Sequence, residues 1–343
     1  MAKKYRDSIF YDKKTVIGMD DTMITKKTLL EEEVNRLIHS ADAKTGEDLV
    51  IDAEVTGFTR IGEGKHSVSA VIASFGSKQI ECVIPENDFM DFPEFDEALG
   101  YGSEKKMHAA FLQSTQWAKI YIVLKPVIPG MANNIIIDEE TGMVQAVCSR
   151  KIAMDRLYKD YWLPKADGKR IINDGCLVMA RVIRVANSCI FVECYGVEFQ
   201  IPLRELSWHR LSYAQEAFTP GDVVKIMILD IQYSDDEENE RPYVVASVKE
   251  ANENPQVAAF PRVTTNNNYT GVVKNPCNGK FFVTLDQTDA EVLCDQGDYT
   301  VRTPQRGDKC VVRIDGKSED TLRIWGTIVR LEQKKISRPK FIV

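Results

Sequence analysis

The chain has 343 residues, 44% of them hydrophobic and 28% charged, and its formal net charge is −7. This length exceeds that of one small barrel and predicts two or three domains. No run of about 18 uninterrupted apolar residues occurs, so we expect no transmembrane helix. The charged start MAKKYRDSIFYDKKT contains no apolar signal-peptide core. We expect a cytoplasmic protein that does not bind a membrane.

The cysteines and histidines argue against a disulfide framework and against a metal site. The eight cysteines form no CxxC pair, and Cys82, Cys148, Cys194 and Cys310 lie inside apolar runs. This pattern predicts buried, reduced thiols. The four histidines lie far apart, whereas zinc ligands cluster. We therefore expect no metal and no cofactor.

An amphipathic helix is expected in an N-terminal extension, residues 1–46. Within KTLLEEEVNRLIHSA, Thr28 and Glu31 fit the capping box that begins a helix. The apolar side chains that share one face of this helix are Leu29, Leu30, Val34, Leu37 and Ile38. Such a helix would dock on a domain or on a partner.

Residues 47–164 predict a degenerate barrel with a helical insertion. Its strand-like runs are EDLVIDAEVTGF, HSVSAVIASFG, KQIECVIPENDF, WAKIYIVLKPVI and MVQAVCSRK. The insertion DFPEFDEALGYGSEKKMHAAFLQS has a partly helical pattern. Candidate linkers at 165–170 and 253–268, the second rich in Pro, Asn and Thr, follow this region and the next one.

Residues 171–255 contain five runs that alternate apolar and polar residues, as half-buried strands do. The acidic stretch SDDEENE separates the last two runs and is typical of a solvated hairpin tip. Five strands with a short connector after the third match a small Greek-key barrel of the OB type.

Residues 266–332 repeat this pattern. Val182 precedes Phe191 by the same nine residues that separate Val273 from Phe282, and a Gly-Asp step precedes the fourth strand in both copies. Such a coincidence indicates an internal repeat. A basic tail, 333–343, follows. The predicted fold class is mainly β with helical insertions: three tandem five-stranded OB-fold barrels and an N-terminal helical extension.

The middle repeat resembles the RNA-binding repeat of the ribosomal protein S-one family. The resemblance rests on ARVIRV, IFVECYGVEFQIPLRELSW, GDVVKIMILDI and SVKEANENP, between Gly175 and Pro255. The connector SRKIAMDRLYKDYW resembles those of multi-repeat, bacterial-type members. The third repeat shows the resemblance more weakly, and residues 1–45 do not show it. The resemblance implies a barrel that holds single-stranded RNA on one face through aromatic and basic residues.

The family pattern is matched only in part. Phe191 and its counterpart Phe282 stand where the stacking aromatic of the second strand usually stands. Ser188 replaces an earlier aromatic of that strand, and Pro202 stands where a histidine is often found. Near the fifth strand, Tyr243 stands in place of the usual arginine.

The candidate RNA-binding residues combine rings, which stack on any base, with cations, which neutralise phosphates. They are Phe191, Arg204, Trp208, His209, Arg210, Tyr213, Arg241, Tyr243, Lys249, Phe282, Arg323 and Trp325. We expect those of the middle repeat to converge on one outer wall of the central barrel, whereas Phe282, Arg323 and Trp325 belong to the third repeat.

Structural alternatives exist for several of these residues. Strand alternation leaves open whether Phe191 faces the core or a ligand, and Trp208 either closes the barrel or stacks on a base. Trp325 and Arg323 share one strand face. Trp325 could stack on a base while Arg323 contacts a phosphate, or Trp325 could belong to the core while Arg323 lies at its edge.

The cations have alternatives of their own. Arg204 and Arg210 fit phosphate contacts or solvated surface charges. Arg241 adjoins the five carboxylates of SDDEENE, so an intramolecular ion pair competes with phosphate.

Two functions fit these patterns. The first is non-catalytic binding of single-stranded RNA, with the middle barrel making most of the contacts; the family resemblance implies messenger RNA and a link to translation. The alternative is a protein-interaction scaffold with little RNA affinity, in which the outer barrels and the helix at 27–39 dock on the ribosomal small subunit or another complex. The chain contains no P-loop, GxSxG or HExxH motif. We therefore expect no catalytic residue and no small-molecule substrate.

Overall fold

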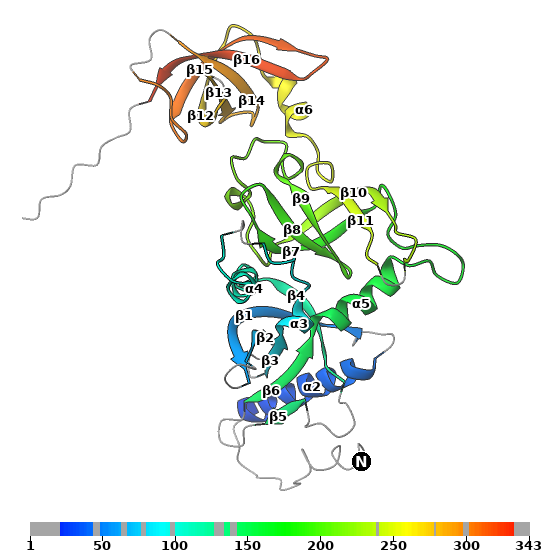
Figure 1. Ribbon diagram of the computed structural model, residues 1–343. Coiled ribbons are helices and arrows are strands. Elements are labelled where there is room, and N and C mark those ends of the chain that lie inside the picture. The colour runs from blue at the N-terminus through cyan, green and yellow to red at the C-terminus, as the bar shows by residue number, and fades with distance from the viewer. Residues whose placement is uncertain are drawn as a thin grey trace, which may run out of the picture.

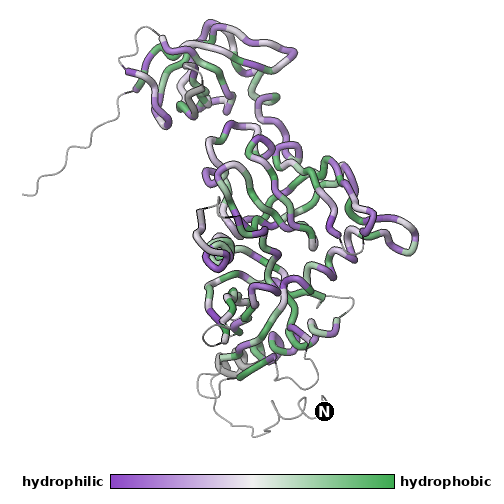
Figure 2. The backbone as a smooth tube through the Cα atoms, in the orientation of Figure 1, coloured by the Kyte–Doolittle hydropathy of each residue, from purple (hydrophilic) through white to green (hydrophobic). Residues whose placement is uncertain are grey.

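The computed structural model describes residues 21–43, 49–62, 67–76, 80–96, 100–126, 134–137, 143–237, 240–277, 279–297 and 302–332. The fold is mainly β, with 43% strand and 21% helix, and three barrel-like sheets follow one another along the molecule (Figure 1). The expected fold class is confirmed. Hydrophobic segments follow the strands, and hydrophilic segments gather in the turns (Figure 2). The predicted basic tail, 333–343, lies outside the described residues.

The first sheet is a closed barrel with one added strand. Its order is β3-β2-β1-β4-β6-β5, and a parallel pairing of β3 with β6 closes the barrel. The strands are β1 (Ile51–Ile61), β2 (Val68–Phe75), β3 (Ile80–Pro85), β4 (Lys119–Leu124), β5 (Ile135–Ile137) and β6 (Val144–Ser149). The insertion after β3 is partly helical, as expected, and forms α3 (Glu86–Phe89) and α4 (Glu104–Gln113).

The N-terminal helix, α2 (Asp21–Asp42), packs on this first barrel. It begins before Thr28, so the predicted capping box is wrong and Thr28 lies inside the helix. Val34 and Leu37 are buried in the barrel core. Arg156 of α5 (Arg150–Tyr161), the helix that follows β6, donates hydrogen bonds to carbonyl groups at the end of α2. The apolar face of the helix is therefore used within the molecule.

The second sheet has the order β11-β10-β7-β8-β9. The helix α5 (Arg150–Tyr161) leads into it from the first barrel. The backbone N–H groups of Val248 and Lys249, just after β11, donate to the Glu205 carbonyl, just after β9. These bonds tie the two edge strands together. The elements are β7 (Leu177–Val185), β8 (Cys189–Cys194), β9 (Val197–Pro202), η4 (Leu203–Glu205), η5 (Ala214–Glu216), β10 (Val223–Gln232) and β11 (Tyr243–Ser247).

The third sheet is a closed barrel with the order β12-β13-β14-β16-β15. The segment at 253–268, interpreted above as a linker, forms α6 (Pro255–Ala259) and η6 (Phe260–Arg262), and Phe260 and Val263 belong to the barrel core. Its Asn and Pro begin a helix instead of a loop, because Asn254 caps α6 and proline suits the first turn. The strands are β12 (Asn268–Cys277), β13 (Lys280–Leu285), β14 (Glu291–Gln296), β15 (Lys309–Ser318) and β16 (Arg323–Leu331).

The three sheets share one irregularity in their first strand. In β1, β7 and β12 the pairing register shifts directly after Val55, Val182 and Val273 respectively. A bulge bends a strand and increases its twist, as barrel closure requires. The repeat found by sequence in the second and third barrels therefore extends to the first.

Each of these valines exchanges two backbone hydrogen bonds with the turn before the fourth strand. Val182 bonds the step Gly221-Asp222, and Val273 bonds Gly307-Asp308 in the same way. In the first barrel the partner of Val55 is Trp117-Ala118. The tryptophan thus occupies a place that is glycine in the other two barrels.

The four cysteines predicted to be buried, Cys82, Cys148, Cys194 and Cys310, are 0% exposed, which confirms the prediction. Burial raises the pKa of Cys194 and of Cys310 to about 12, so both thiols stay protonated at neutral pH. Within the described ranges, no helix is long and apolar enough to cross a membrane.

Candidate nucleic-acid interface

Two adjoining grooves lie where the turn after β9 meets the third barrel. One has a volume of about 790 Å³ and is lined mainly by the turn after β9. The other has a volume of about 950 Å³ and extends along the third barrel to Trp325. Both are lined by Trp208, His209, Arg210 and Phe282. We call the two together the inter-barrel groove.

Most of the sequence-predicted residues meet in this groove. The central-barrel residues do not all share one wall as expected, because Phe191, Tyr213, Arg241 and Tyr243 lie outside the groove, which also takes side chains from the third barrel. The second sheet and its turns contribute Arg204, Trp208, His209, Arg210 and Lys249, and the third barrel contributes Phe282, Arg323 and Trp325.

The third barrel presents an apolar row to the groove. Phe282 on β13 is paired with Leu293 on β14, which is paired in turn with Trp325 on β16. Side chains two residues apart share a strand face, so Lys280 flanks this row on β13 and Arg323 flanks it on β16. Leu293 was missed by sequence reasoning, since only the strand register shows that it lies between two rings.

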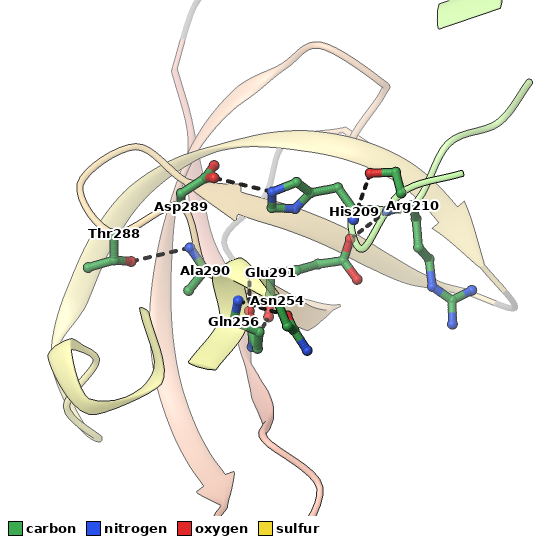
Figure 3. A network of polar contacts seen from close by, with 9 residues as sticks. His209, Arg210, Asn254, Gln256, Thr288, Asp289, Ala290 and Glu291 are labelled. Atoms are coloured by element: carbon green, nitrogen blue, oxygen red, sulfur yellow. Dashed lines mark hydrogen bonds and ion pairs between the residues drawn. The ribbon is translucent and has the colours of Figure 1, made fainter. Parts of the chain in front are cut away.

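The tip of the turn after β9 contacts the third barrel through polar groups (Figure 3). A ring nitrogen of His209 lies 3.2 Å from a carboxylate oxygen of Asp289, and the backbone N–H of Arg210 donates to Glu291 at 3.1 Å. The Arg210 side chain points away from these carboxylates (Figure 3), and its guanidinium lies 4.1 Å from the centroid of the Phe282 ring. This cation–π contact joins the two barrels across the groove.

Trp208 lies at the edge of the second barrel. It is half-buried and outside the barrel core. Its Nε1–H donates to the Asn252 carbonyl at 3.1 Å, and the Lys249 ammonium lies 5.5 Å from the ring centroid. Lys249 also pairs with the Glu205 carboxylate at 3.3 Å, so its charge is partly neutralised.

The cations of the groove differ in how far they are already paired. Lys280 pairs with Asp295 at 3.0 Å, as Lys249 pairs with Glu205. Arg204 is 84% exposed, and its only described carboxylate contact is a long one of 3.7 Å to Glu205. No carboxylate in the described part of the chain pairs with the guanidinium of Arg210 or Arg323. These three arginines are therefore the cations available to a phosphate.

Four predicted residues lie outside the groove: Phe191, Tyr213, Tyr243 and Arg241. Tyr213 is 44% exposed, with the Arg306 guanidinium 5.4 Å from its ring centroid. Tyr243 is 64% exposed on β11. Arg241 makes an intramolecular ion pair, but its partner is Asp155 of α5, at 3.2 Å.

Phe191 faces the first barrel and does not belong to the core. The Arg184 guanidinium lies 3.6 Å from the centroid of its ring and 4.9 Å from that of Phe111 in α4. A separate groove of about 610 Å³ runs beside it, lined by residues that include Lys151 and Gln200. The stacking surface expected on the central barrel is therefore covered by Arg184 of its own sheet, which also contacts the insertion of the first barrel through Phe111.

A buried ion cluster joins the first two barrels, and sequence reasoning missed it. Arg150 is 1% exposed and donates to Glu193 at 2.6 Å, to Glu198 at 3.1 Å and to the Phe89 carbonyl at 3.1 Å. Burial lowers the pKa of Arg150, but attraction from the two carboxylates outweighs it and raises the pKa above the ordinary value. The one signal in the sequence is Glu193, a lone acid inside the apolar run IFVEC.

No family model matches the chain, and no curated protein matches its sequence. Solved structures similar to it include one titled as an a/eIF2alpha-aDim2p-rRNA complex from Pyrococcus horikoshii, with 14% identity and a TM-score of 0.21, covering 26% of this chain and 56% of that one. A multidomain protein with nucleic acid binding domains from Streptococcus pneumoniae has 11% identity and a TM-score of 0.19, covering 81% of this chain and 72% of that one.

Drosophila Unr CSD456 has 11% identity and a TM-score of 0.17, covering 48% of this chain and 65% of that one. The chain thus spans little more than half the length of the first of these structures. At identities and TM-scores this low, the likenesses carry no inference about what the chain binds.

Proposed function

We propose that the chain binds single-stranded RNA in the inter-barrel groove and performs no chemistry on it. The observation that carries this proposal is the meeting, in one groove, of the exposed Trp325 ring and two half-buried rings with arginines that have at most one long carboxylate contact among the described residues. Trp325, Phe282 and Trp208 offer aromatic surface, and each base stacked on such a ring contributes about 1–3 kcal/mol.

Acidic side chains lie on one side of the groove and two arginines lie on the other, which favours an RNA strand whose bases contact one wall and whose phosphates contact the other. Glu291 and Asp295 lie on the third-barrel side and accept hydrogen bonds from protein groups. Arg204 and Arg210 lie on the second-barrel side. We infer that bases contact the third barrel and that phosphates contact the turn after β9.

The choice of RNA rests on the resemblance of the middle repeat to the ribosomal protein S-one family. That resemblance supports messenger RNA as the ligand and the small ribosomal subunit, in the cytoplasm, as the neighbour. Stacking reads little of the base sequence, so we propose binding with weak sequence preference. Because the two barrels are linked, RNA bound to one barrel has a high effective concentration for contact with the other.

A salt titration with a short fluorescent oligouridine tests this function. We expect affinity to fall as salt rises, with a log–log slope of about −0.7 for each phosphate contact on a single strand. Arg204→Ala and Arg210→Ala should each make the slope less negative by about that amount. The matched control is Lys105→Ala, which removes an exposed cation on α4 outside the groove, and which should leave the slope unchanged.

The scaffold alternative is favoured by one observation. Leu177, Met179 and Val223 are 56%, 48% and 48% exposed on β7 and β10, and register places them on the outer face of the second sheet. Oligouridine affinity that is absent near physiological salt, or independent of salt, would favour the scaffold over RNA binding. Weaker binding of the matching deoxyribose strand would indicate contacts with the 2′-hydroxyl group.

A further inference from the structure

The indole of Trp325 lies against the backbone of a glycine on the neighbouring strand. Gly316 on β15 is paired with Trp325 on β16. A Cβ atom at Gly316 would lie less than 3.0 Å from three atoms of the indole ring. Any other residue at this position would therefore displace the ring.

Backbone conformation does not require this glycine. Gly316 lies within β15 and is not among the described residues with a positive φ, so an L-residue would adopt its conformation without strain. The bulge beside it, between Ile314 and Gly316, does not require glycine either, since only a left-handed bulge residue does. Glycine is needed here because the Trp325 indole occupies the space that a side chain would take.

The opposite face of the Trp325 ring is open to the inter-barrel groove. The side chain is 45% exposed and lines the groove. The other two rings of the groove each have a cation over them, Arg210 over Phe282 and Lys249 over Trp208. Among the described residues, no cation lies over Trp325. A base can therefore stack there without displacing a protein group.

We propose that Gly316 is a positioning residue, which holds Trp325 flat as the first stacking surface for an unpaired base in the groove. This proposal rests on the proposed function and specifies how the groove begins to hold its strand. A stacked base needs a ring whose plane is fixed and whose face is free. Gly316 fixes the plane from behind and leaves the front free.

The test is a double-mutant cycle measured by oligouridine binding to the full chain. Trp325→Ala should raise Kd roughly 5- to 150-fold, the loss of one stacked base. Gly316→Ala should raise Kd roughly 3- to 30-fold, because a displaced ring stacks less well. In the Trp325→Ala background, Gly316→Ala should cause no further loss, because the glycine acts only through the ring.

Tryptophan fluorescence gives an independent signal. Oligouridine should quench the wild-type protein, and the part of the quenching that is lost in Trp325→Phe should also be lost in Gly316→Ala. The matched control is Gly57→Ala in the first barrel, where a Cβ would make only ordinary contact with Ile72. It should change neither Kd nor quenching. If Gly316→Ala fails to fold, the double variant should fold, because the clash is with the indole.

The outcomes separate the two proposals. If the wild type does not bind oligouridine, the proposed function itself is wrong. If the wild type binds and Trp325→Ala weakens binding, but Gly316→Ala does not, the positioning role is wrong and the function stands. A further loss from Gly316→Ala in the Trp325→Ala background would also overturn the positioning role.

Discussion

Trp117 has a left-handed backbone conformation, with φ of 70°, at a place where the other barrels have Gly221 and Gly307, with φ of 93° and 82°. Such a conformation costs about 1–2 kcal/mol for a residue with a side chain. The Trp117 carbonyl also contacts the second barrel, since a Cβ at Gly221 would lie less than 3.0 Å from its oxygen. The first two barrels therefore meet where their equivalent turns face each other.

Gly221→Ala is predicted to destabilise the protein more than Gly175→Ala. Both glycines have positive φ, 93° and 80°, and Ala strains each by about 1–2 kcal/mol. Only Gly221 faces a carbonyl oxygen, because nothing lies within 4 Å of a Cβ at Gly175. Chemical denaturation of the two variants measures the difference. Equal losses in free energy of unfolding would show that the contact between the turns adds nothing.

At the scale of the element, α6 shows how a short helix joins two parts of the protein. The Gln256 side-chain amide accepts a hydrogen bond from the Glu291 N–H at 2.9 Å and donates to the Glu291 and Leu322 carbonyls, both at 3.1 Å. The side-chain amide of Gln256 thus bonds both backbone groups of Glu291 in β14, as the backbone of a neighbouring strand would. Together with Phe260 in the barrel core, this contact attaches the start of the third barrel to its sheet.

Gln256→Ala is predicted to lower the free energy of unfolding by about 1–3 kcal/mol, because half-buried backbone groups lose their partners. Gln256→Glu should lose at least as much, since the carboxylate oxygen that replaces the amide NH2 group would face the Glu291 and Leu322 carbonyl oxygens and repel them. Hydrogen exchange at the Glu291 amide reports this contact directly. Unchanged exchange in Gln256→Ala would show that the contact contributes no protection.

At the scale of the whole molecule, the two junctions between barrels differ in chemistry. The first junction contains the buried Arg150 and Glu193, which are removed from solvent. The second contains exposed or partly exposed polar contacts, which are the contact of His209 with Asp289, the hydrogen bond from Arg210 N–H to Glu291 and the ion pair of Arg306 with Glu216. Exposed pairs contribute little each and respond to salt and pH. The second junction is therefore the one that solution conditions should loosen.

Acid is predicted to loosen the arrangement of the second and third barrels. Partial burial raises the pKa of Glu216, but hydrogen bonds and charge from Arg306 outweigh it and lower the pKa below the ordinary value. Because the pKa of Glu216 is lowered, the ionised carboxylate stabilises the junction fully at any pH above the ordinary pKa of a glutamate. This stabilisation is lost as the pH falls through the lowered pKa, where the carboxylate becomes protonated. Below about pH 4, energy transfer between dyes on the two barrels should broaden.

The control for this prediction is Glu216→Gln, which removes the titrating group. It should show a broad distribution at neutral pH and a smaller further change in acid. His209 lies 3.2 Å from Asp289 at the same junction, so His209→Ala separates the contribution of that contact. An acid response of full size in Glu216→Gln would contradict the role of this pair.

Local patterns in the sequence were sufficient to identify the strands, the repeat and the buried cysteines. Alternation of apolar and polar residues decides which side of a strand is buried, and it needs no information from distant parts of the chain. The equal spacing from Val182 to Phe191 and from Val273 to Phe282 reflects the same bulge and strand register in both barrels. It could be recognised because it involves only residues close together in the sequence. The matching turn of the first barrel could not be recognised from the sequence, because the residues in the place of Gly-Asp are Trp117-Ala118.

Tertiary structure decided where the candidate ligand site lies. Residue types indicated rings and cations, but only the contacts of Arg210 with Phe282 and of His209 with Asp289 bring the two barrels to one groove. Arg184 covers Phe191 as a cross-strand neighbour within the second sheet, but the Phe111 ring beside Arg184 comes from a helix of the first barrel. Periodicity encodes the face of each residue within its own sheet, whereas the distance between sheets is set by polar contacts and connecting helices that no local pattern contains.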